Sequence, residues 1–376
     1  MEYRKLEKAG LEASLFGLGC MRFPTDDKGK IDEEYAIKLI REAIDGGVNY
    51  FDTAYVYNDK DSGRVLGKAL QGGYREKVII ADKMPVWLAK SQEDLEKIFN
   101  EQLEYLQTDH IDMYLVHNAK AANWKLAKRL DLMSFLEKKK AEGKIGHIGF
   151  SIHDSLETFK EILDEYPWEF CQLQLNFMDK DLQTGLQGLK CAAEKGIDVI
   201  IMEPLKGGRL TDKVPPAVQK LWDESGENMK PVEAAFKWLA NMPEIKVILS
   251  GVSSIEQLRE NIQVFSDENV SKLTDKQKDL ITKVSDEYNR LIKYGCTWCN
   301  YCLPCPKRLD IPTLINYYND WNVYEQNPST VDEYINWVPP GRHASDCIGC
   351  RECEEKCTQA LPIADIMKEM ARDMGK

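Results

Sequence analysis

The chain has 376 residues, of which 43% are hydrophobic and 30% are charged, and its 62 acidic and 50 basic side chains give a net charge of -12. This composition is typical of a globular protein and excludes a disordered or collagen-like chain. The acidic balance contains no basic block, which disfavours binding to nucleic acid. No apolar run reaches the length of about 18 residues that a membrane span needs, and no signal segment follows Met1, so we expect a soluble cytoplasmic protein.

Residues 1–265 alternate short apolar, β-rich segments with helical patterns such as Glu33–Asp45, Gln92–Leu106 and Lys125–Lys140. Near-continuous apolar strands between helices predict a parallel sheet, and eight such units favour a closed (β/α)8 TIM barrel. An open doubly wound sheet is the alternative, but no G-x-G-x-x-G follows a first strand. The expected strands are Ser14–Leu18, Val48–Asp52, Val78–Ala81, Ile111–His117, Ile145–Phe150, Phe170–Leu175, Val199–Met202 and Val247–Leu249.

Eight of the 11 cysteines lie in two runs near the end of the chain, spaced C-x2-C-x2-C-x2-C-P and C-x2-C-x2-C-x3-C. Disulfides are disfavoured in the cytoplasm, and a structural zinc site usually takes two pairs of cysteines separated by a loop. Three cysteines at x2 intervals suit three corners of an iron–sulfur cube, with the fourth supplied from elsewhere, as in two-cluster ferredoxins. The runs are Cys296, Cys299, Cys302, Cys305 and Cys347, Cys350, Cys353, Cys357.

These runs predict two [4Fe-4S] clusters. A crossed pattern gives the first cluster Cys357 beside the first three cysteines of the first run, and gives the second cluster Cys305 beside the first three of the second run. We therefore expect a barrel at residues 1–265, a charged helical connector at 266–294 on the exterior of the barrel, and a small α-helical ferredoxin-like iron–sulfur domain at 295–376.

Four polar side chains stand at or just beyond the ends of apolar strands, where parallel barrels carry their reactive groups. Asp52 ends one strand and Tyr57 follows five residues later, while Lys83 and His117 end the next two strands. A buried ammonium needs a partner, and Asp52 on the neighbouring strand can supply one to Lys83. Each residue alone has an ordinary structural explanation, but four at one rim predict a catalytic site.

In this order and spacing the four residues resemble the tetrad of the aldo-keto reductase superfamily, over roughly residues 1–265. With the cysteine-rich tail, the whole chain resembles a subgroup of that family that carries a C-terminal ferredoxin-like domain. The resemblance implies hydride transfer between NAD(P)H and a carbonyl or alcohol substrate. Tyr57 would be the general acid/base, His117 would hydrogen-bond the carbonyl oxygen, and Lys83 would lower the pKa of Tyr57 while Asp52 holds Lys83.

The resemblance also implies a nicotinamide site. Many relatives bind the adenosine 2'-phosphate with Lys and Arg where this chain has Gly251 and Gln257, so both NADP and NAD remain candidates. Met202 stands where an aromatic residue commonly covers the nicotinamide ring, and a thioether can do the same. The implied cofactor-binding residues are Gly19, Cys20, Met21, Asp52, Ser151, Gln172, Met202, Pro204, Leu205, Gly251, Ser253, Gln257, Glu260 and Asn261.

The role of the clusters stays open at this stage among electron transfer with an outside carrier, structural stapling, and docking on a larger redox complex. Two other functions stay open with it: a ferredoxin-linked enzyme that uses no free nicotinamide, and a non-enzymatic docking subunit. A redox partner protein is therefore one expected partner beside the small substrate. Trp87, Trp124 and Phe177 are candidates for an apolar substrate wall.

Overall fold

The structure is a computed structural model, and it describes residues 1–26, 30–212, 214–296, 301–357 and 359–375. The chain divides into two compact units. The first consists of Met1–Gly207 and Val232–Thr274, and the second of Gly208–Pro231 and Asp275–Lys376. Each unit has a hydrophobic core of its own.

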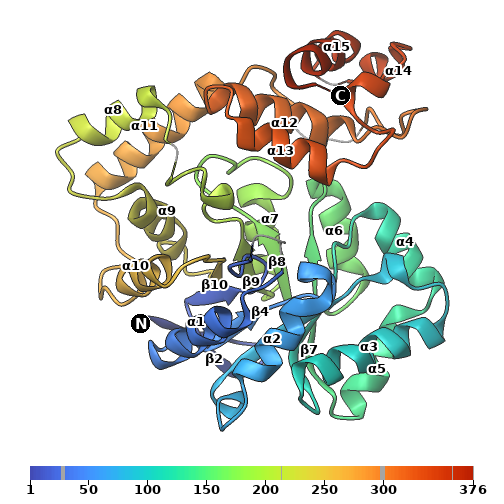
Figure 1. Cartoon of the computed structure of the whole chain (residues 1–376), viewed down its shortest axis with the longest axis vertical. Coiled ribbons are helices and arrows are strands. Elements are labelled where there is room, and N and C mark those ends of the chain that lie inside the picture. Colours follow the sequence, from blue (N-terminus) through green and yellow to red (C-terminus); the bar gives the residue numbers. More distant parts are fainter. Residues whose placement is uncertain (27–29, 213, 297–300, 358, 376) are drawn as a thin grey trace. The chain divides into compact units, whose positions relative to one another are not determined.

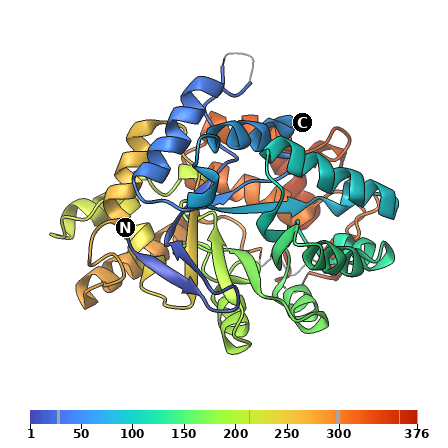
Figure 2. The ribbon, with the colours of Figure 1, turned by 90° about the horizontal axis from the view of Figure 1, so that it is seen from below.

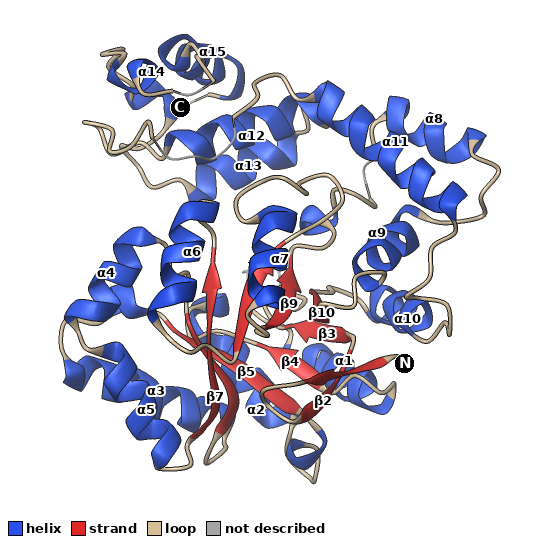
Figure 3. Cartoon of the chain, turned by 180° about the vertical axis from the view of Figure 1, so that it is seen from behind, coloured by secondary structure: helices blue, strands red, loops and turns tan. Residues whose placement is uncertain are grey.

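The first unit is built on a closed barrel of parallel strands, in the order β10-β3-β4-β5-β6-β7-β8-β9. This closure confirms the predicted barrel and excludes an open doubly wound sheet. Figure 3 shows the strands surrounded by helices. The strands are β3 (Phe16–Gly19), β4 (Tyr50–Asp52), β5 (Ile79–Met84), β6 (Ile111–Val116), β7 (Ile145–Ile152), β8 (Phe170–Gln174), β9 (Asp198–Met202) and β10 (Ile245–Ser250).

Helices connect the strands and cover the outer face of the barrel (Figure 1). Several begin at a residue whose side chain accepts a backbone hydrogen bond, such as Asp32 before α1 and Ser91 before α3. The helices are α1 (Glu33–Asp45), α2 (Asp61–Ala69), α3 (Gln92–Leu106), α4 (Ala121–Arg129), α5 (Leu132–Ala141), α6 (Leu156–Glu165), α7 (Gly185–Glu194), α9 (Pro231–Ala240) and α10 (Ile255–Phe265), with the short turns η1 (Tyr57–Lys60), η2 (Arg75–Lys77), η3 (Val86–Leu88) and η4 (Lys206–Gly208).

A β-hairpin fills the amino end of the barrel. Its strands, β1 (Tyr3–Leu6) and β2 (Leu11–Ser14), pair antiparallel, and Figure 2 shows the barrel from below with the hairpin in dark blue. Leu6 and Ala13 belong to the same buried cluster as the side chains that fill the barrel interior. The expected strand Ser14–Leu18 is therefore divided between the end of this hairpin and β3.

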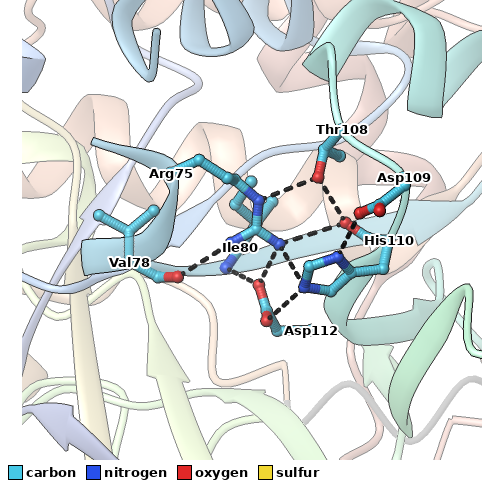
Figure 4. A network of polar contacts seen from close by, with 7 residues as sticks. All are labelled: Arg75, Val78, Ile80, Thr108, Asp109, His110 and Asp112. Atoms are coloured by element: carbon cyan, nitrogen blue, oxygen red, sulfur yellow. Dashed lines mark hydrogen bonds and ion pairs between the residues drawn. The ribbon is translucent and has the colours of Figure 1, made fainter. Parts of the chain in front are cut away.

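A polar network binds the amino ends of β5 and β6 together (Figure 4). The guanidinium of Arg75 donates to the carbonyl oxygens of Val78 and His110, at 3.1 and 3.2 Å, and to Asp112 Oδ2 at 2.9 Å. The same carboxylate oxygen accepts from the backbone amide of Ile80 at 2.8 Å. Both charged groups are mostly buried, so the network couples the starts of two strands.

The second unit is helical in its described residues. Its core gathers apolar side chains that include Leu314, Ile315, Met367 and Met370. Arg209 donates to Asp320 on α12 at 2.9 Å and to Glu333 on α13 at 2.6 Å. The helices are α8 (Pro216–Glu224), α11 (Asp275–Leu291), α12 (Ile311–Val323), α13 (Pro328–Trp337), α14 (Glu352–Glu355) and α15 (Ile363–Met374), with the turn η5 (Ala344–Asp346).

The observed division differs from the predicted domain boundaries at 1–265, 266–294 and 295–376. Residues 208–231 leave the barrel unit, because α8 packs on α11 and Arg209 pairs within the second unit. The expected connector contains α11, which belongs to the second unit. The expected helix Lys125–Lys140 is two helices, since the backbone turns left-handed at Asp131.

Within the described residues, no helix is both long enough and apolar enough to span a bilayer.

Candidate active site

The predicted catalytic residues come from neighbouring elements at the carboxyl end of the barrel. Asp52 is the last residue of β4, Lys83 lies near the end of β5, and His117 follows β6 directly. Tyr57 opens the turn η1 that follows β4. Parallel strands end at the same rim of a barrel, so their order alone brings these segments together.

Lys83 is the centre of the site and is 1% exposed. Its Nζ donates to Asp52 Oδ1 at 2.5 Å and to the carbonyl oxygen of Thr53 at 2.7 Å. The third contact of Nζ is with Tyr57 Oη, at 3.5 Å. The two acceptors hold the ammonium in place, and its third N–H is free to point towards the phenol oxygen of Tyr57.

The electrostatics of this group bear on one expectation. Burial opposes the charge of Lys83, but Asp52 and Tyr57 outweigh it and raise the pKa of Lys83 above its ordinary value. Burial also raises the pKa of Tyr57, and although the charge of Lys83 acts to lower it, the pKa lies above its ordinary value overall. Lys83 therefore acts on the Tyr57 pKa in the expected direction, but burial, which the sequence did not reveal, has the larger effect. A phenol with a raised pKa stays protonated and can donate.

His117 completes the group as a neutral imidazole. Its ring lies edge-on to that of Tyr57, with the centroids 6.2 Å apart, and Trp87 lies 5.0 Å away on another side. Burial, assisted by the charge of Lys83 and by His153, holds the pKa of His117 well below its ordinary range. Its Nδ1 is buried and has no hydrogen-bond partner among the described residues.

Two supporting residues escaped sequence reasoning. Asp82 is buried beside Lys83, accepts from the backbone amide of Lys83 at 2.7 Å, and has its pKa raised by burial to about 7. Gln102, on α3, donates to the carbonyl oxygen of Lys83 at 2.9 Å. A second acidic residue inside the apolar strand, directly before the lysine, was a signal that could have found Asp82.

Three of the implied nicotinamide residues lie on adjacent strands. Ser151 and Gln172 are paired in register on β7 and β8, and Met202 ends β9. Gln172 is 1% exposed and donates to Asp52 Oδ2 at 2.9 Å, while its Oε1 has no partner within the described chain. Ser151 Oγ accepts from the backbone amide of Asn118 at 3.0 Å. An amide oxygen without a partner suits a ligand that carries its own N–H donors, so Gln172 fits a carboxamide group.

The side chain of Cys20 is fully buried in the core, so only its backbone can face a ligand, while Met21 is exposed. In the loop after β10, the backbone amide of Ser253 donates to Oε1 of Gln257, on α10, at 2.9 Å. Asn261 is buried on α10 and donates to Ser250 at 3.2 Å. The remaining implied residues lie on the loops and elements at the ends of β3, β9 and β10: Gly19, Pro204, Leu205, Gly251 and Glu260.

Arg22 brings a positive charge that sequence reasoning missed. Its Nη2 lies 3.0 Å from the position of a Cβ on Gly207, and its stem passes 3.2 Å from that of Gly251. A side chain at either glycine would displace the arginine. The glycines thus leave room for a guanidinium between the loops after β9 and β10.

Five of the predicted cluster ligands line one pocket in the second unit. No group of three or more His, Cys, Asp or Glu in the described chain is arranged to hold a single metal ion. Cys296 and Cys357 pack against the same apolar core, and Cys299 lies outside the described residues. The lining cysteines are Cys302, Cys305, Cys347, Cys350 and Cys353.

The expected apolar wall is reduced to Trp87, which is 37% exposed. Trp124 is buried, its ring lies tilted against that of Trp168, and its Nε1 donates to Glu165, so it belongs to the core and not to a substrate wall. Phe177 is 1% exposed. Both residues are corrected from candidate wall to interior packing.

A closed parallel barrel whose charged and titratable groups gather at the carboxyl ends of its strands has the layout of a barrel enzyme. The model of the "Aldo/keto reductase family" matches residues 16–286, and the chain belongs to that family. It is an NAD(P)-dependent oxidoreductase, in agreement with the oxidoreductases that it resembles.

The chain is 30% identical to the L-galactose dehydrogenase of Arabidopsis thaliana over 286 residues, which cover 70% of this chain and 87% of that protein. It is 27% identical to the uncharacterized oxidoreductase YqkF of Bacillus subtilis, covering 74% of this chain and 94% of that one. Among solved structures, the holo form of the aldo-keto reductase AKR11C1 from Bacillus halodurans superposes with a TM-score of 0.64 at 26% identity, over 76% of this chain and 96% of that one.

Proposed function

We propose that the chain transfers a hydride between a nicotinamide cofactor, NAD or NADP, and a carbonyl or alcohol substrate, with Tyr57 as general acid/base. The observation that carries the proposal is the placement of Lys83, which is held by Asp52 and Thr53 and lies 3.5 Å from the phenol oxygen. The likeness to an L-galactose dehydrogenase also supports the oxidation of alcohols to carbonyls.

A bound nicotinamide would supply the hydride for reduction and accept it in oxidation. Tyr57 donates its phenolic proton to the carbonyl oxygen, so that oxygen becomes a hydroxyl and the phenolate is left behind. Lys83 stabilises that phenolate by charge, while Asp52 keeps Lys83 protonated and oriented. His117, neutral at pH 7, donates a hydrogen bond to the substrate oxygen and fixes its approach.

The residues for holding the cofactor are those of the carboxyl-end loops. Gln172 and Ser151 would take the carboxamide, and Met202 would cover one face of the ring. Arg22, between the loops that carry Gly207 and Gly251, would meet a phosphate of the nucleotide. The guanidinium of Arg22 would supply a positive charge that the uncharged residues Gly251 and Gln257 do not.

The test of this function is the Tyr57→Phe variant. Replacing the hydroxyl removes the proton donor and keeps the ring, so turnover should fall about 10²- to 10⁴-fold. Oxidation of NADH and NADPH with a panel of aldehydes measures turnover, and quenching of nicotinamide fluorescence measures binding. Cofactor binding should stay within about twofold of the parent chain, because the ring is retained. Full turnover in the variant would refute the role of Tyr57.

We propose further that the eight cysteines hold two [4Fe-4S] clusters, whose one-electron chemistry would connect the protein to a redox partner protein. The support is that Cys305 from the first run lines the same space as Cys347, Cys350 and Cys353 from the second run. The crossed sharing of ligands requires that neighbourhood.

Iron and acid-labile sulfide analysis of anaerobically prepared protein tests this proposal. The parent chain should contain about eight irons, and Cys350→Ser should contain about four, since it removes a ligand of one cluster. Cys191→Ser, on α7 of the barrel unit, is the matched control and should keep the full content. Zinc in place of iron, or an equal loss in both variants, would contradict the proposal.

A further inference from the structure

Three consecutive residues directly after Tyr57 have left-handed backbones, although none of them is glycine. The φ angles are 48° at Asn58, 51° at Asp59 and 77° at Lys60. This conformation brings Cβ close to the carbonyl oxygen, so it is unfavourable for residues other than glycine, and least so for Asn and Asp. Lys60 also stands at the N-cap of α2, where its side chain makes no capping hydrogen bond. The local sequence therefore does not favour this turn, and contacts from elsewhere in the chain must hold it.

Glu101, on α3, contacts the chain on both sides of Tyr57. The hydroxyl of Tyr55 donates to Glu101 Oε2 at 2.6 Å, and Lys60 Nζ donates to the same oxygen at 3.3 Å. The ammonium of Lys60 also lies over the ring of Tyr55, 4.4 Å from the centroid. Tyr55 is buried, and the side chain of Glu101 is 23% exposed, so these contacts are partly shielded from water. One carboxylate oxygen thus joins the residue two positions before the phenol to the residue three positions after it.

The next residue of α3 holds the partner of the phenol. Gln102 donates to the carbonyl oxygen of Lys83 at 2.9 Å, and its Oε1 accepts from the hydroxyl of Tyr114 at 2.5 Å. Both Gln102 and Tyr114 are buried. Consecutive residues of one helix therefore hold the lysine and the turn that carries the tyrosine. A helix is a rigid support for such a pair, and Lys83 Nζ lies 3.5 Å from Tyr57 Oη.

We propose that Glu101 is a positioning residue for proton transfer: its carboxylate holds the unfavourable left-handed turn and thereby keeps the phenol of Tyr57 against Lys83. The inference rests on the proposed function, in which Tyr57 transfers the proton. Glu101 acts through the turn and not on the reacting atoms. Without its carboxylate the turn relaxes towards a more favourable backbone conformation and carries the phenol away from the ammonium. A displacement of about 1 Å at a reacting group lowers the rate by up to about 100-fold.

The first variant is Glu101→Ala. Oxidation of alcohols with NAD or NADP should slow about 10- to 100-fold in kcat, while the Kd of the nicotinamide stays within about twofold. The pH dependence of kcat separates positioning from a general loss of folded protein. A phenol that moves away from Lys83 loses the charge that acts to lower its pKa, so the apparent pKa of Tyr57 should rise. Slower turnover with an unchanged pH profile would overturn the proposal.

A rescue and a control make the test specific for the turn. Glycine adopts the left-handed conformation without strain, so Glu101→Ala/Lys60→Gly should recover about fivefold or more of the lost turnover. Glu101→Gln keeps an acceptor for Tyr55 and should lose less than Glu101→Ala. The matched control is Glu96→Ala on the same helix, which breaks an ion pair of 2.7 Å with Lys139 and should leave turnover and the pH profile unchanged. No recovery with glycine, or an equal loss in the control, would assign the effect to the packing of α3 and overturn the proposal.

A spectroscopic measurement separates this inference from the proposed function. The protein is labelled with 3-fluorotyrosine, and the fluorine resonance of Tyr57 is identified in each variant by its absence after Tyr57→Phe. The chemical shift of that resonance should change in Glu101→Ala and return towards the parent value when Lys60→Gly is added. If no alcohol or carbonyl compound is turned over with either nicotinamide, the proposed function fails. The resonance then decides alone: a change that glycine reverses supports the hold of Glu101 on the turn, and an unchanged resonance overturns it.

Discussion

At the amino ends of β5 and β6, the guanidinium of Arg75 is bonded to two carbonyls and to Asp112, which itself accepts from a strand amide. At the carboxyl end, by contrast, His117 and the amides of Asn58 and Asn118 retain buried polar atoms that no described residue satisfies. The barrel therefore carries a fully paired network around Arg75 at one end and several unpaired side-chain atoms at the other.

The difference separates stability from function. A satisfied network fixes strand ends and needs no ligand, whereas an unsatisfied group costs free energy that only a binding partner recovers. Parallel barrels generally place catalysis at the carboxyl end and stabilising contacts at the amino end. Here the hydrogen bonds of individual side chains follow that rule.

The largest effect is expected for Lys83→Met, at the carboxyl end of the barrel. The phenol then has no neighbouring charge to stabilise its conjugate base, so kcat should fall about 10³-fold or more. The variant also leaves the carboxylate of Asp52 buried without its ammonium, which should destabilise the fold. A steady-state assay and a thermal melt measure the two effects. A variant that melts early but keeps full turnover would exclude the assigned role of Lys83.

Arg75→Met disrupts the polar network at the amino end of the barrel. The variant leaves the mostly buried Asp112 without its cation and removes several hydrogen bonds, so the free energy of unfolding should fall by about 2–4 kcal/mol. Turnover below the melting temperature should not change, because the network lies at the end away from the site. Urea denaturation measures the first quantity. A large loss of kcat with little loss of stability would reverse the division between the two ends.

Asp82→Asn tests whether a buried side chain next to the catalytic lysine affects the pH dependence of stability. The native pKa of Asp82, about 7, lies above the ordinary value of 3.8, so the folded chain binds more protons than the unfolded chain between about pH 4 and 7. Stability contributed by this group is present below pH 4 and lost as pH rises to 7, by roughly 2–4 kcal/mol. The variant should flatten that part of the stability curve. An unchanged pH dependence would show that Asp82 stays ionised.

Periodicity and strand-end chemistry were sufficient to predict the barrel, because both are local patterns. Helices α1 and α3 begin and end where predicted. The grouping of Asp52, Lys83 and His117 could also be predicted from the sequence, because each lies at the end of a strand and parallel strands end at the same rim of a barrel.

Other features depend on contacts that sequence spacing does not encode. The hairpin formed by β1 and β2 is short, and its position is set by Leu6 and Ala13 entering the barrel interior. The departure of residues 208–231 from the barrel rests on Arg209 meeting two acidic residues more than a hundred positions away. The net direction of the Tyr57 pKa depends on the balance between burial and charge, which no motif reveals.

The hairpin closes the barrel at its amino end, so that the interior is open only at the carboxyl end. With Leu6 and Ala13 sealing its floor, loading and unloading take place through the carboxyl end. Gln172 lies one layer deeper than Gln174 on β8. A ligand bound at the level of Gln172 would therefore have to enter before a ligand bound at the level of Gln174 and leave after it. Binding and release would then follow a fixed order.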